Sequence, residues 1–146
     1  MMIRTYMACT LLFAVRCAFA ASIGAYSFPP DKGPLLVQQC SRDSPRDAKD
    51  FFKPTPSQIV ELEERLGPYL DGVRPDIHFQ DYNRQYVGFM KSGVRYIYGN
   101  FFKPEPGDWS LALEPVIICD GGDVAWGVVY SLESKAFQDL HFNGVG

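Results

Sequence analysis

Residues 84–101 read RQYVGFMKSGVRYIYGNF, and this stretch decides the fold. The runs 84–90 and 94–101 are rich in Tyr, Val, Ile and Phe, and they flank the short polar sequence Lys91-Ser92-Gly93. Aromatic and β-branched residues on both sides of a glycine-containing turn are typical of a β-hairpin. We therefore predict two antiparallel strands joined by a turn.

Three further strands are predicted downstream, at 116–119, 124–131 and 136–142. The sequence Asp120-Gly121-Gly122-Asp123 between the first two of them is a strong hairpin signal, because its glycines can adopt positive φ. The five segments together predict an antiparallel meander of about five strands.

One amphipathic helix is predicted before the strands. Thr55 is a good N-cap, Pro56 suits the first helical position, and Gln58 completes a capping box. The apolar residues that recur at helical spacing are Ile59, Leu62, Leu66 and either Tyr69 or Leu70. Gly67-Pro68 is expected to kink or end the helix. The helix should lie across one face of the sheet, which makes the predicted fold class α+β.

The alternation of side chains divides the strand residues between two faces of the sheet. The small residues Ala125 and Gly127 suit the close approach of the helix on one face. The opposite face is then expected to carry Tyr96, Tyr98, Trp126 and Tyr130. If it is open, it is a candidate partner-binding surface. If the proline-rich N-terminal segment covers it, these rings belong to the core.

Residues 1–20 have the pattern of a secretory signal peptide. Arg4 gives a positive start, 5–15 are mostly apolar, and Ala18-Phe19-Ala20 is a small-x-small cleavage site. The apolar run is about half of the roughly twenty residues that a membrane-spanning helix needs. We expect cleavage after Ala20, a periplasmic or secreted location, and no transmembrane segment in the mature chain. The alternative is an uncleaved anchor.

Residues 21–54 are expected to be a poorly structured lead-in to a domain at 55–146. The lead-in contains five prolines, and its stretch 41–50 is dense in charge and nearly free of large apolar side chains. Such a composition buries too little apolar surface to offset the entropy lost on ordering. Only Leu35-Leu36-Val37 could dock, and Cys40 just beyond could pin this run to the domain.

The charge balance limits the class of partner. Removing residues 1–20 takes away Arg4 and Arg16, so the formal net charge falls from −3 to −5. A nucleic-acid-binding domain needs a basic surface, and an anionic membrane also attracts basic segments. We expect neither of these partners, whereas a basic protein partner is compatible with the charge.

Cys40 and Cys119 are the cysteines that remain after cleavage. In an oxidising compartment they allow one intramolecular pairing. Two free thiols or an intermolecular bond are the alternatives.

No recognisable catalytic or cofactor motif occurs in the sequence. It has no Gly-x-Ser-x-Gly nucleophile elbow, and His78 and His141 lack metal-ligand spacing to the cysteines. Asp120 and Asp123 flank two glycines, but the ligand pattern of a calcium loop is incomplete. We predict no metal and no cofactor. An enzyme that uses Asp120, Asp123 or His141 near the strand ends remains an alternative.

Several stretches carry a resemblance to known proteins: 82–88 (YNRQYVG), Trp109, 115–122 (PVIICDGG), 126–128, Phe137, Leu140 and 143–144. Residues 55–146 in this respect resemble a group of small, uncharacterised exported proteins of the bacterial envelope. That group has no established activity, so the resemblance implies an envelope location and no particular reaction. The expected shape is also similar to cystatins and several periplasmic inhibitors, a likeness of fold alone.

The leading functional hypothesis is a non-enzymatic, exported protein-binding domain that resembles an inhibitor or immunity protein. Glu105, Asp108 and Glu114 of the long loop could meet a basic partner. An envelope enzyme of unrecognised type and a structural or assembly factor of the envelope are the alternatives. The sequence leaves the oligomeric state undetermined.

Overall fold

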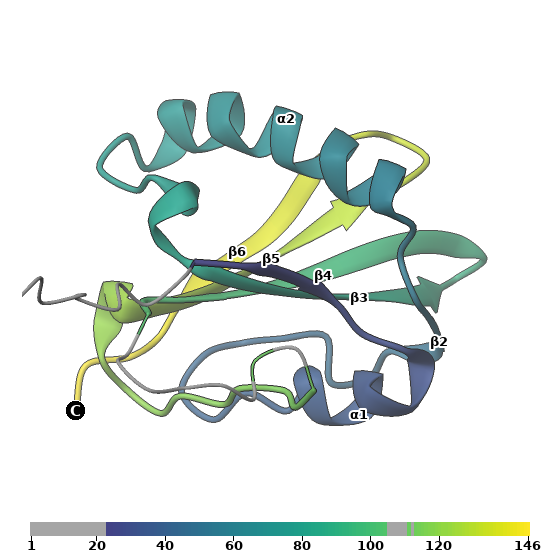
Figure 1. Cartoon of the computed structure of the whole chain (residues 1–146), viewed down its shortest axis with the longest axis horizontal. Helices are drawn as coiled ribbons and strands as arrows, with labels where there is room; N and C mark the ends of the chain where they lie inside the picture. The colour runs from purple at the N-terminus through teal and green to yellow at the C-terminus, as the bar shows by residue number, and fades with distance from the viewer. Residues whose placement is uncertain (1–22, 105–110, 112) are drawn as a thin grey trace, which may run out of the picture.

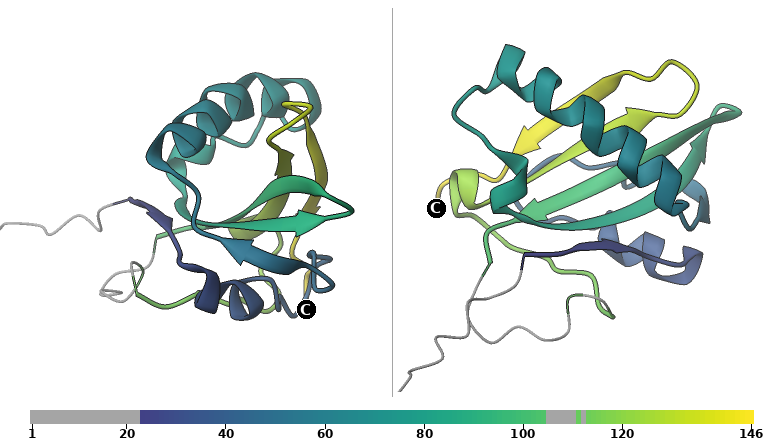
Figure 2. Two further views of the ribbon diagram at one scale, coloured as in Figure 1. Left: turned by 90° about the vertical axis from the view of Figure 1, so that its right-hand side faces the viewer. Right: turned by 45° about the horizontal axis from the view of Figure 1, so that its top comes forward.

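The computed structural model describes residues 23–104, 111 and 113–146. A mixed β-sheet lies between a long helix on one face and a layer of short helix and irregular chain on the other (Figure 1). The view along the sheet in Figure 2 shows these three layers. The expected α+β class is confirmed, and the expected signal peptide at 1–20 lies outside the described residues.

The element bounds follow the chain order. The strands are β1 (Ala25–Ser27), β2 (Lys49–Phe52), β3 (Asn83–Lys91), β4 (Val94–Phe102), β5 (Ala125–Ser131) and β6 (Phe137–Phe142). The α-helices are α1 (Gly33–Leu36) and α2 (Pro56–Val73). The short 3-10 helices are η1 (Pro30–Lys32), η2 (Phe79–Asp81) and η3 (Gly122–Val124).

The hairpin of β3 and β4 is the centre of the sheet. These strands pair without interruption from Asn83 opposite Phe102 to Lys91 opposite Val94. Ser92 and Gly93 between them have φ values of 52° and 78°, and positive φ at both positions is what a tight two-residue hairpin turn requires. The strand order is β1-β3-β4-β5-β6, and β2 also pairs with β3. Because β1 runs parallel to β3, the sheet is mixed rather than wholly antiparallel.

The predicted strand at 116–119 is wrong. This segment crosses the sheet face opposite α2 as irregular chain, and side-chain amides satisfy its backbone instead of a neighbouring strand. Gln85 Oε1 accepts from the Val116 N–H at 2.8 Å, and Asn100 Nδ2 donates to the Val116 carbonyl at 3.0 Å. Asn143 Nδ2 donates to the Ile118 carbonyl at 2.7 Å. The apolar run therefore has backbone partners without joining the sheet.

The expectation of a poorly structured lead-in is also wrong from residue 23 onward. β1 and β2 both pair with β3. Phe28, Leu36 and Val37 are 1%, 0% and 1% exposed, and they cover the sheet face opposite α2. Composition was misleading because a few well-placed apolar side chains bury this segment against a sheet that the rest of the chain supplies.

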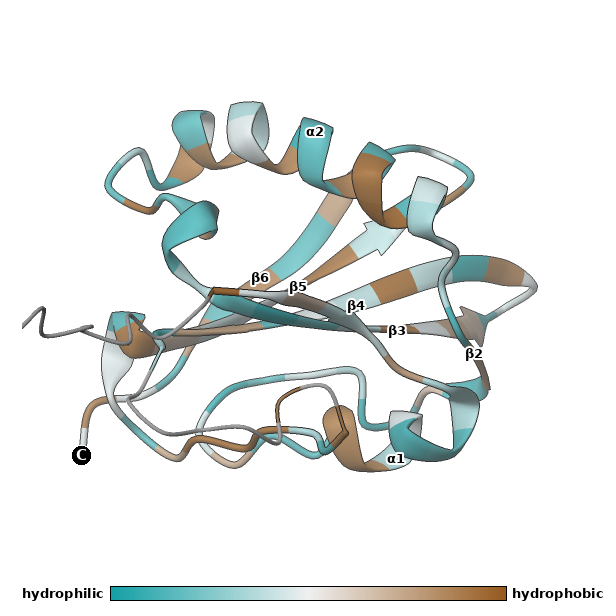
Figure 3. Ribbon diagram, in the orientation of Figure 1, coloured by the Kyte–Doolittle hydropathy of each residue, from teal (hydrophilic) through white to brown (hydrophobic). Residues whose placement is uncertain are grey.

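α2 covers the other face of the sheet. Thr55 and Gln58 exchange the two hydrogen bonds of a capping box at its start. Leu62, Leu66 and Leu70 are buried, and Figure 3 shows the hydrophobic residues of α2 on the side facing the sheet. The helix does not end at Gly67-Pro68. Pro68 is exposed, so the carbonyl that it leaves without a partner can bind water while the buried leucines hold the helix.

The predicted distribution of aromatic side chains over the two faces is wrong. Ile97 pairs with Tyr130 and Tyr98 pairs with Val129, so adjacent strands place Tyr98 and Tyr130 on opposite faces. Trp126 and Tyr130 belong to the core beneath α2. Alternation within each strand was read correctly, but only the pairing register decides which face of one strand continues that of the next.

The disulfide between Cys40 and Cys119 is present, which confirms the intramolecular pairing. It links the N-terminal layer to the irregular segment that crosses the sheet. None of the helices within the described residues is long and apolar enough to cross a membrane.

Replacing both Cys40 and Cys119 by alanine is expected to lower the free energy of unfolding by about 4 kcal/mol, because the unfolded chain loses a cross-link spanning 79 residues. Equilibrium unfolding in urea measures the change. Wild-type protein under reducing conditions is the control and should behave as the double variant does. Equal urea midpoints for the variant and the oxidised wild type would contradict this prediction.

Candidate ligand groove

The structure does not gather the four predicted site residues on one open face. Tyr98, Trp126 and Tyr130 are 1%, 0% and 0% exposed, whereas Tyr96 is partly exposed. α2 covers Trp126 and Tyr130, and the N-terminal layer covers most of the face that carries Tyr96 and Tyr98. The sequence left open whether the aromatic face is exposed or covered by the N-terminal segment. The structure shows that this segment covers most of the face that carries Tyr96 and Tyr98.

The cover over Tyr96 and Tyr98 is incomplete. A groove of about 240 Å³ lies between the segment 43–47 and the strands β3 to β6. Its lining residues are Asp43, Ser44, Pro45, Asp47, Phe89, Lys91, Tyr96, Tyr98, Val129, Gln138, Asp139 and His141. Two of the four predicted aromatic residues therefore line one cavity, although Trp126 and Tyr130 do not.

Aromatic and aliphatic side chains form the floor of the groove. The rings of Phe89 and Tyr96 stack with their centroids 5.4 Å apart and their planes 21° from parallel. Tyr98 and Val129 extend this floor toward β5. The Tyr98 ring lies over Gly127, where an added Cβ would come within 2.5 Å of the Tyr98 hydroxyl oxygen. Gly127 thus makes room for Tyr98, and not for the helix as predicted.

Carboxylates predominate at the rim. Asp47 forms an ion pair with Lys91, with 3.3 Å between Oδ2 and Nζ. Asp43 and Asp139 have no ion pair within the part of the chain that the structure describes. His141 is the remaining titratable side chain there. The rim therefore presents unneutralised negative charge beside an aromatic floor.

A bulge in β6 brings Asp139 to the rim. The pairing of β5 with β6 shifts between Gly127 and Val129, and Asp139 has a φ of 53°. Bulges re-aim side chains, and they are frequent on edge strands. Sequence reasoning missed this residue because no glycine or proline marks the bulge.

Arg42 lies behind the groove and is only 6% exposed. Its Nε and Nη2 atoms donate to the Tyr98 hydroxyl oxygen at 3.4 and 3.2 Å, and it also donates to the side-chain oxygens of Asn100 and Asn143. Burial raises the pKa of the Tyr98 hydroxyl, although the Arg42 charge opposes the rise. Sequence reasoning placed Arg42 in the charge-dense stretch 41–50 and expected no structure there.

The residues proposed for an enzyme do not form a catalytic arrangement. His141 lines the groove, whereas Asp123 forms an ion pair with Arg74 at 2.9 Å and Asp120 lies in the turn before β5. No hydrogen bond joins His141 to a carboxylate among residues 23–104, 111 and 113–146. The same residues contain no group of three or more His, Cys, Asp or Glu side chains that could hold a metal ion.

Glu114, the one acidic loop residue among those that the structure describes, does not line the groove. Glu114 forms an ion pair with Lys32 at 2.8 Å. Glu105 and Asp108 lie outside the described residues. The expected contribution of this loop to a basic partner therefore gains no support from Glu114, which already has a cation.

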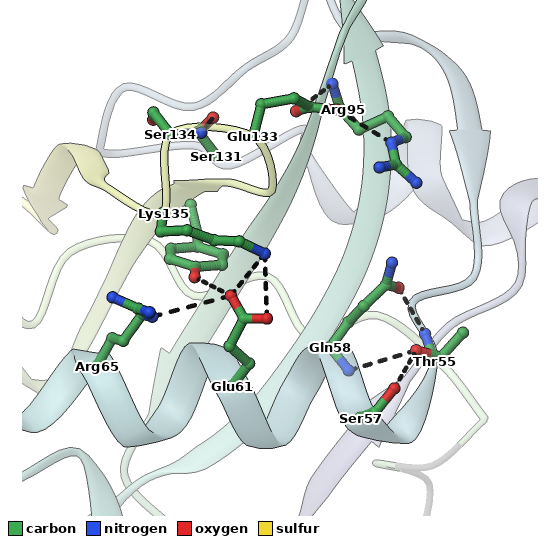
Figure 4. Close-up of polar contacts among 11 residues, drawn as sticks. Thr55, Ser57, Gln58, Glu61, Arg65, Arg95, Ser131, Glu133, Ser134 and Lys135 are labelled. Carbon is green, nitrogen blue, oxygen red and sulfur yellow. Dashed lines mark hydrogen bonds and ion pairs between the residues drawn. The ribbon is translucent and has the colours of Figure 1, made fainter.

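A second polar cluster, shown in Figure 4, fastens α2 to the sheet. Glu61 accepts a hydrogen bond from the Tyr130 hydroxyl at 2.6 Å, and its Oε1 lies 2.8 Å from Lys135 Nζ. The hydrogen bonds from Lys135 and Tyr130 hold the pKa of Glu61 below its usual value. Burial, together with Glu61, raises the pKa of Tyr130. This cluster has a structural explanation, since it gives a buried tyrosine its acceptor.

Glu61→Gln is expected to lower stability at pH 7, because a carboxylate with a lowered pKa stabilises the fold while it is ionised. The loss should shrink as the pH falls through the usual Glu value of about 4.3 and below, where the wild type loses the same contribution. Thermal unfolding between pH 3 and 7 measures it. Glu64→Gln, an exposed change on the same helix, is the control. A difference that stayed constant with pH would contradict the assignment.

Gly127→Ala is expected to destabilise the protein by about 1–3 kcal/mol, because the new methyl group displaces Tyr98 from a packed position. Gly72→Ala is the matched control, since nothing lies within 4 Å of an added Cβ at this position in α2. It should stabilise the helix by up to about 1 kcal/mol. Urea unfolding of both variants tests the pair, and equal stability of Gly127→Ala and wild type would show that Tyr98 is not confined.

Comparison with known proteins adds no identification. No protein-family model, no curated protein and no solved structure matches this chain. The groove and its residues are therefore the basis for any statement about function.

Proposed function

We propose that this chain is an exported, non-enzymatic binding domain whose groove accepts a basic segment of a partner protein. The observation that carries the proposal is the partly exposed ring of Tyr96, stacked on the buried Phe89, beside the rim carboxylates Asp43 and Asp139, which have no ion pair among the described residues. A lysine or arginine side chain matches both features. Its aliphatic stem packs on the Tyr96 ring, and its charged head reaches the carboxylates.

The size of the groove supports a role as the central pocket of a larger interface. A volume of about 240 Å³ accommodates one or two side chains rather than a folded element. Central pockets that receive one anchoring side chain commonly contribute most of the binding free energy of an interface. The formal net charge of −5 without residues 1–20 would also speed the association of a basic partner.

The exported location rests on the signal-peptide pattern, on the resemblance to exported envelope proteins and on the disulfide. Disulfides persist in oxidising compartments such as the periplasm and the extracellular space. An inhibitor-like or immunity-like role fits such a domain, because blocking a partner requires affinity and no chemistry of its own.

An enzyme of unrecognised type is the second candidate, and the observation that favours it is the presence of His141 and Asp139 in one groove. A general base needs a partner that orients it and a proton within hydrogen-bond reach. The described residues give His141 no such carboxylate partner, so binding is the better-supported function.

The proposal is tested by capture from envelope extract with the immobilised chain 21–146, followed by affinity measurement on the purified partner. Tyr96→Ala is expected to weaken binding by about 2 kcal/mol, which is typical of an interface hot spot. Asp43→Asn combined with Asp139→Asn should weaken it and also reduce its dependence on salt.

Asp71→Asn on the exposed side of α2 is the matched control and should bind as the wild type does. A partner that bound all the groove variants with unchanged affinity would refute the groove as its site. Hydrolysis or modification of the partner by the wild type alone would favour the enzyme instead.

A further inference from the structure

We propose that the Tyr98 hydroxyl, polarised by Arg42, is the hydrogen-bond donor with which the groove recognises an oxygen atom of its ligand. The ligand class is a basic amino-acid residue with a peptide carbonyl or carboxylate oxygen close to its side chain. This inference rests on the proposed function, because it assumes that the groove is a binding site.

The hydroxyl group of Tyr98 accepts hydrogen bonds but donates none within the described residues. A guanidinium group carries donors and no acceptor, so the Tyr98 oxygen must accept from Arg42 Nε and Nη2, at 3.4 and 3.2 Å. The hydroxyl hydrogen then needs an acceptor of its own. No hydrogen bond within the described residues provides one, although Tyr98 is only 1% exposed.

The other buried tyrosines show that this fold otherwise satisfies such protons. Tyr82 donates to the Asp123 carbonyl at 2.9 Å, and Tyr86 donates to Glu63 at 2.8 Å. Tyr130 donates to Glu61 at 2.6 Å. Tyr98 differs from all three in that its one hydrogen-bonding partner is itself a donor. A buried donor without an acceptor is costly, and such groups require an explanation.

Because Tyr98 lines the groove, we infer that its proton meets an acceptor that enters from this cavity. Arg42 lies on one side of the hydroxyl oxygen, and the backbone of Gly127 lies so close to it that a Cβ would not fit. Gly127 pairs with His141, and both Tyr98 and His141 line the groove. An acceptor can therefore approach from the cavity beside His141.

The charge on Arg42 makes this proton a strong donor. Arg42 is buried, and its hydrogen-bond acceptors are the neutral oxygens of Tyr98, Asn100 and Asn143. No carboxylate lies within ion-pair distance of it among the residues described. A cation that donates to a hydroxyl oxygen polarises the O–H bond, and this effect is large where water is excluded. A ligand oxygen at Tyr98 would also offset the buried charge.

The rim and the floor of the groove together define the chemical class of the ligand. The rim carboxylates Asp43 and Asp139 suit an ammonium or guanidinium group, whereas the floor at Tyr98 suits an oxygen acceptor. A lysine or arginine residue of a peptide carries both groups a few bonds apart. Its oxygen is a backbone carbonyl inside a chain and a carboxylate at a chain end.

The test uses three small probes with the chain 21–146 in NMR titrations: N-acetyl-lysine N-methylamide, N-acetyl-lysine and n-butylamine. The first carries an ammonium group and carbonyl oxygens, the second adds a carboxylate, and the third has no oxygen. Wild type is expected to bind both lysine probes about two- to tenfold more tightly than butylamine, the factor that one hydrogen bond contributes. Tighter binding of N-acetyl-lysine than of its methylamide identifies a chain end, and equal binding identifies an internal carbonyl.

Tyr98→Phe should abolish the preference for the lysine probes and keep the affinity for butylamine. Tyr69→Phe, a tyrosine on α2, is the matched control and should keep the preference. Because Tyr98→Phe also removes an acceptor from Arg42, the ¹³Cζ shift of Tyr98 in the wild type gives a second readout that needs no variant. It should move with the lysine probes and stay unchanged with butylamine.

The outcomes separate the two proposals. If butylamine binds through Asp43 and Asp139 but the oxygen-bearing probes gain nothing at Tyr98, this inference is overturned and the basic-segment proposal stands. If the lysine probes bind and shift Tyr98 while the aspartate variants have no effect, the oxygen site stands and the proposed cation-binding role of the rim carboxylates fails. If no probe shifts any groove resonance, both proposals are overturned.

Discussion

The structure depends on satisfying the backbone of a layer that has little regular secondary structure. The sheet face opposite α2 is covered by α1 and by irregular chain on both sides of the disulfide. Buried peptide groups need hydrogen-bond partners, and an irregular segment cannot obtain them from a neighbouring strand. Here the amide side chains of Gln85, Asn100 and Asn143 supply them. Two polar residues on the sheet and one directly after β6 thereby replace the strand that the apolar run 116–119 would otherwise form.

The same polar residues connect the cover to the groove. Asn100 and Asn143 also accept hydrogen bonds from Arg42, and Arg42 follows Cys40 by two residues. The disulfide therefore fixes the chain just before Arg42, and the amides fix the guanidinium group itself. The segment 43–47, which comes next, forms one wall of the groove. The disulfide and the hydrogen bonds of Arg42 thus hold the N-terminal layer on the sheet and also fix the wall of the groove.

Signals that act within a few residues could be read from the sequence, whereas those that need the whole fold could not. The hairpin turn at Ser92-Gly93 and the cap at Thr55 depend on local φ values and nearby hydrogen bonds. The groove depends on the register between β4 and β5 and on a bulge at Asp139, which only the assembled sheet defines. Composition also failed for the segment from residue 23, because its few buried side chains count only once the sheet is there to receive them.

The two faces of the sheet differ in whether a buried tyrosine hydroxyl finds its acceptor among the described residues. Beneath α2, Tyr86 and Tyr130 donate to Glu63 and Glu61, and both glutamates belong to the helix. Each of these hydroxyl groups therefore has its acceptor within the protein. On the opposite face, Tyr98 is as deeply buried but receives hydrogen bonds from a cation and donates none within the described chain. If all four buried tyrosines served only packing, the acceptor missing at Tyr98 would be an uncompensated cost. A ligand oxygen entering from the groove would remove that cost, which is why the face that carries the groove, and not the face beneath α2, is where function is expected.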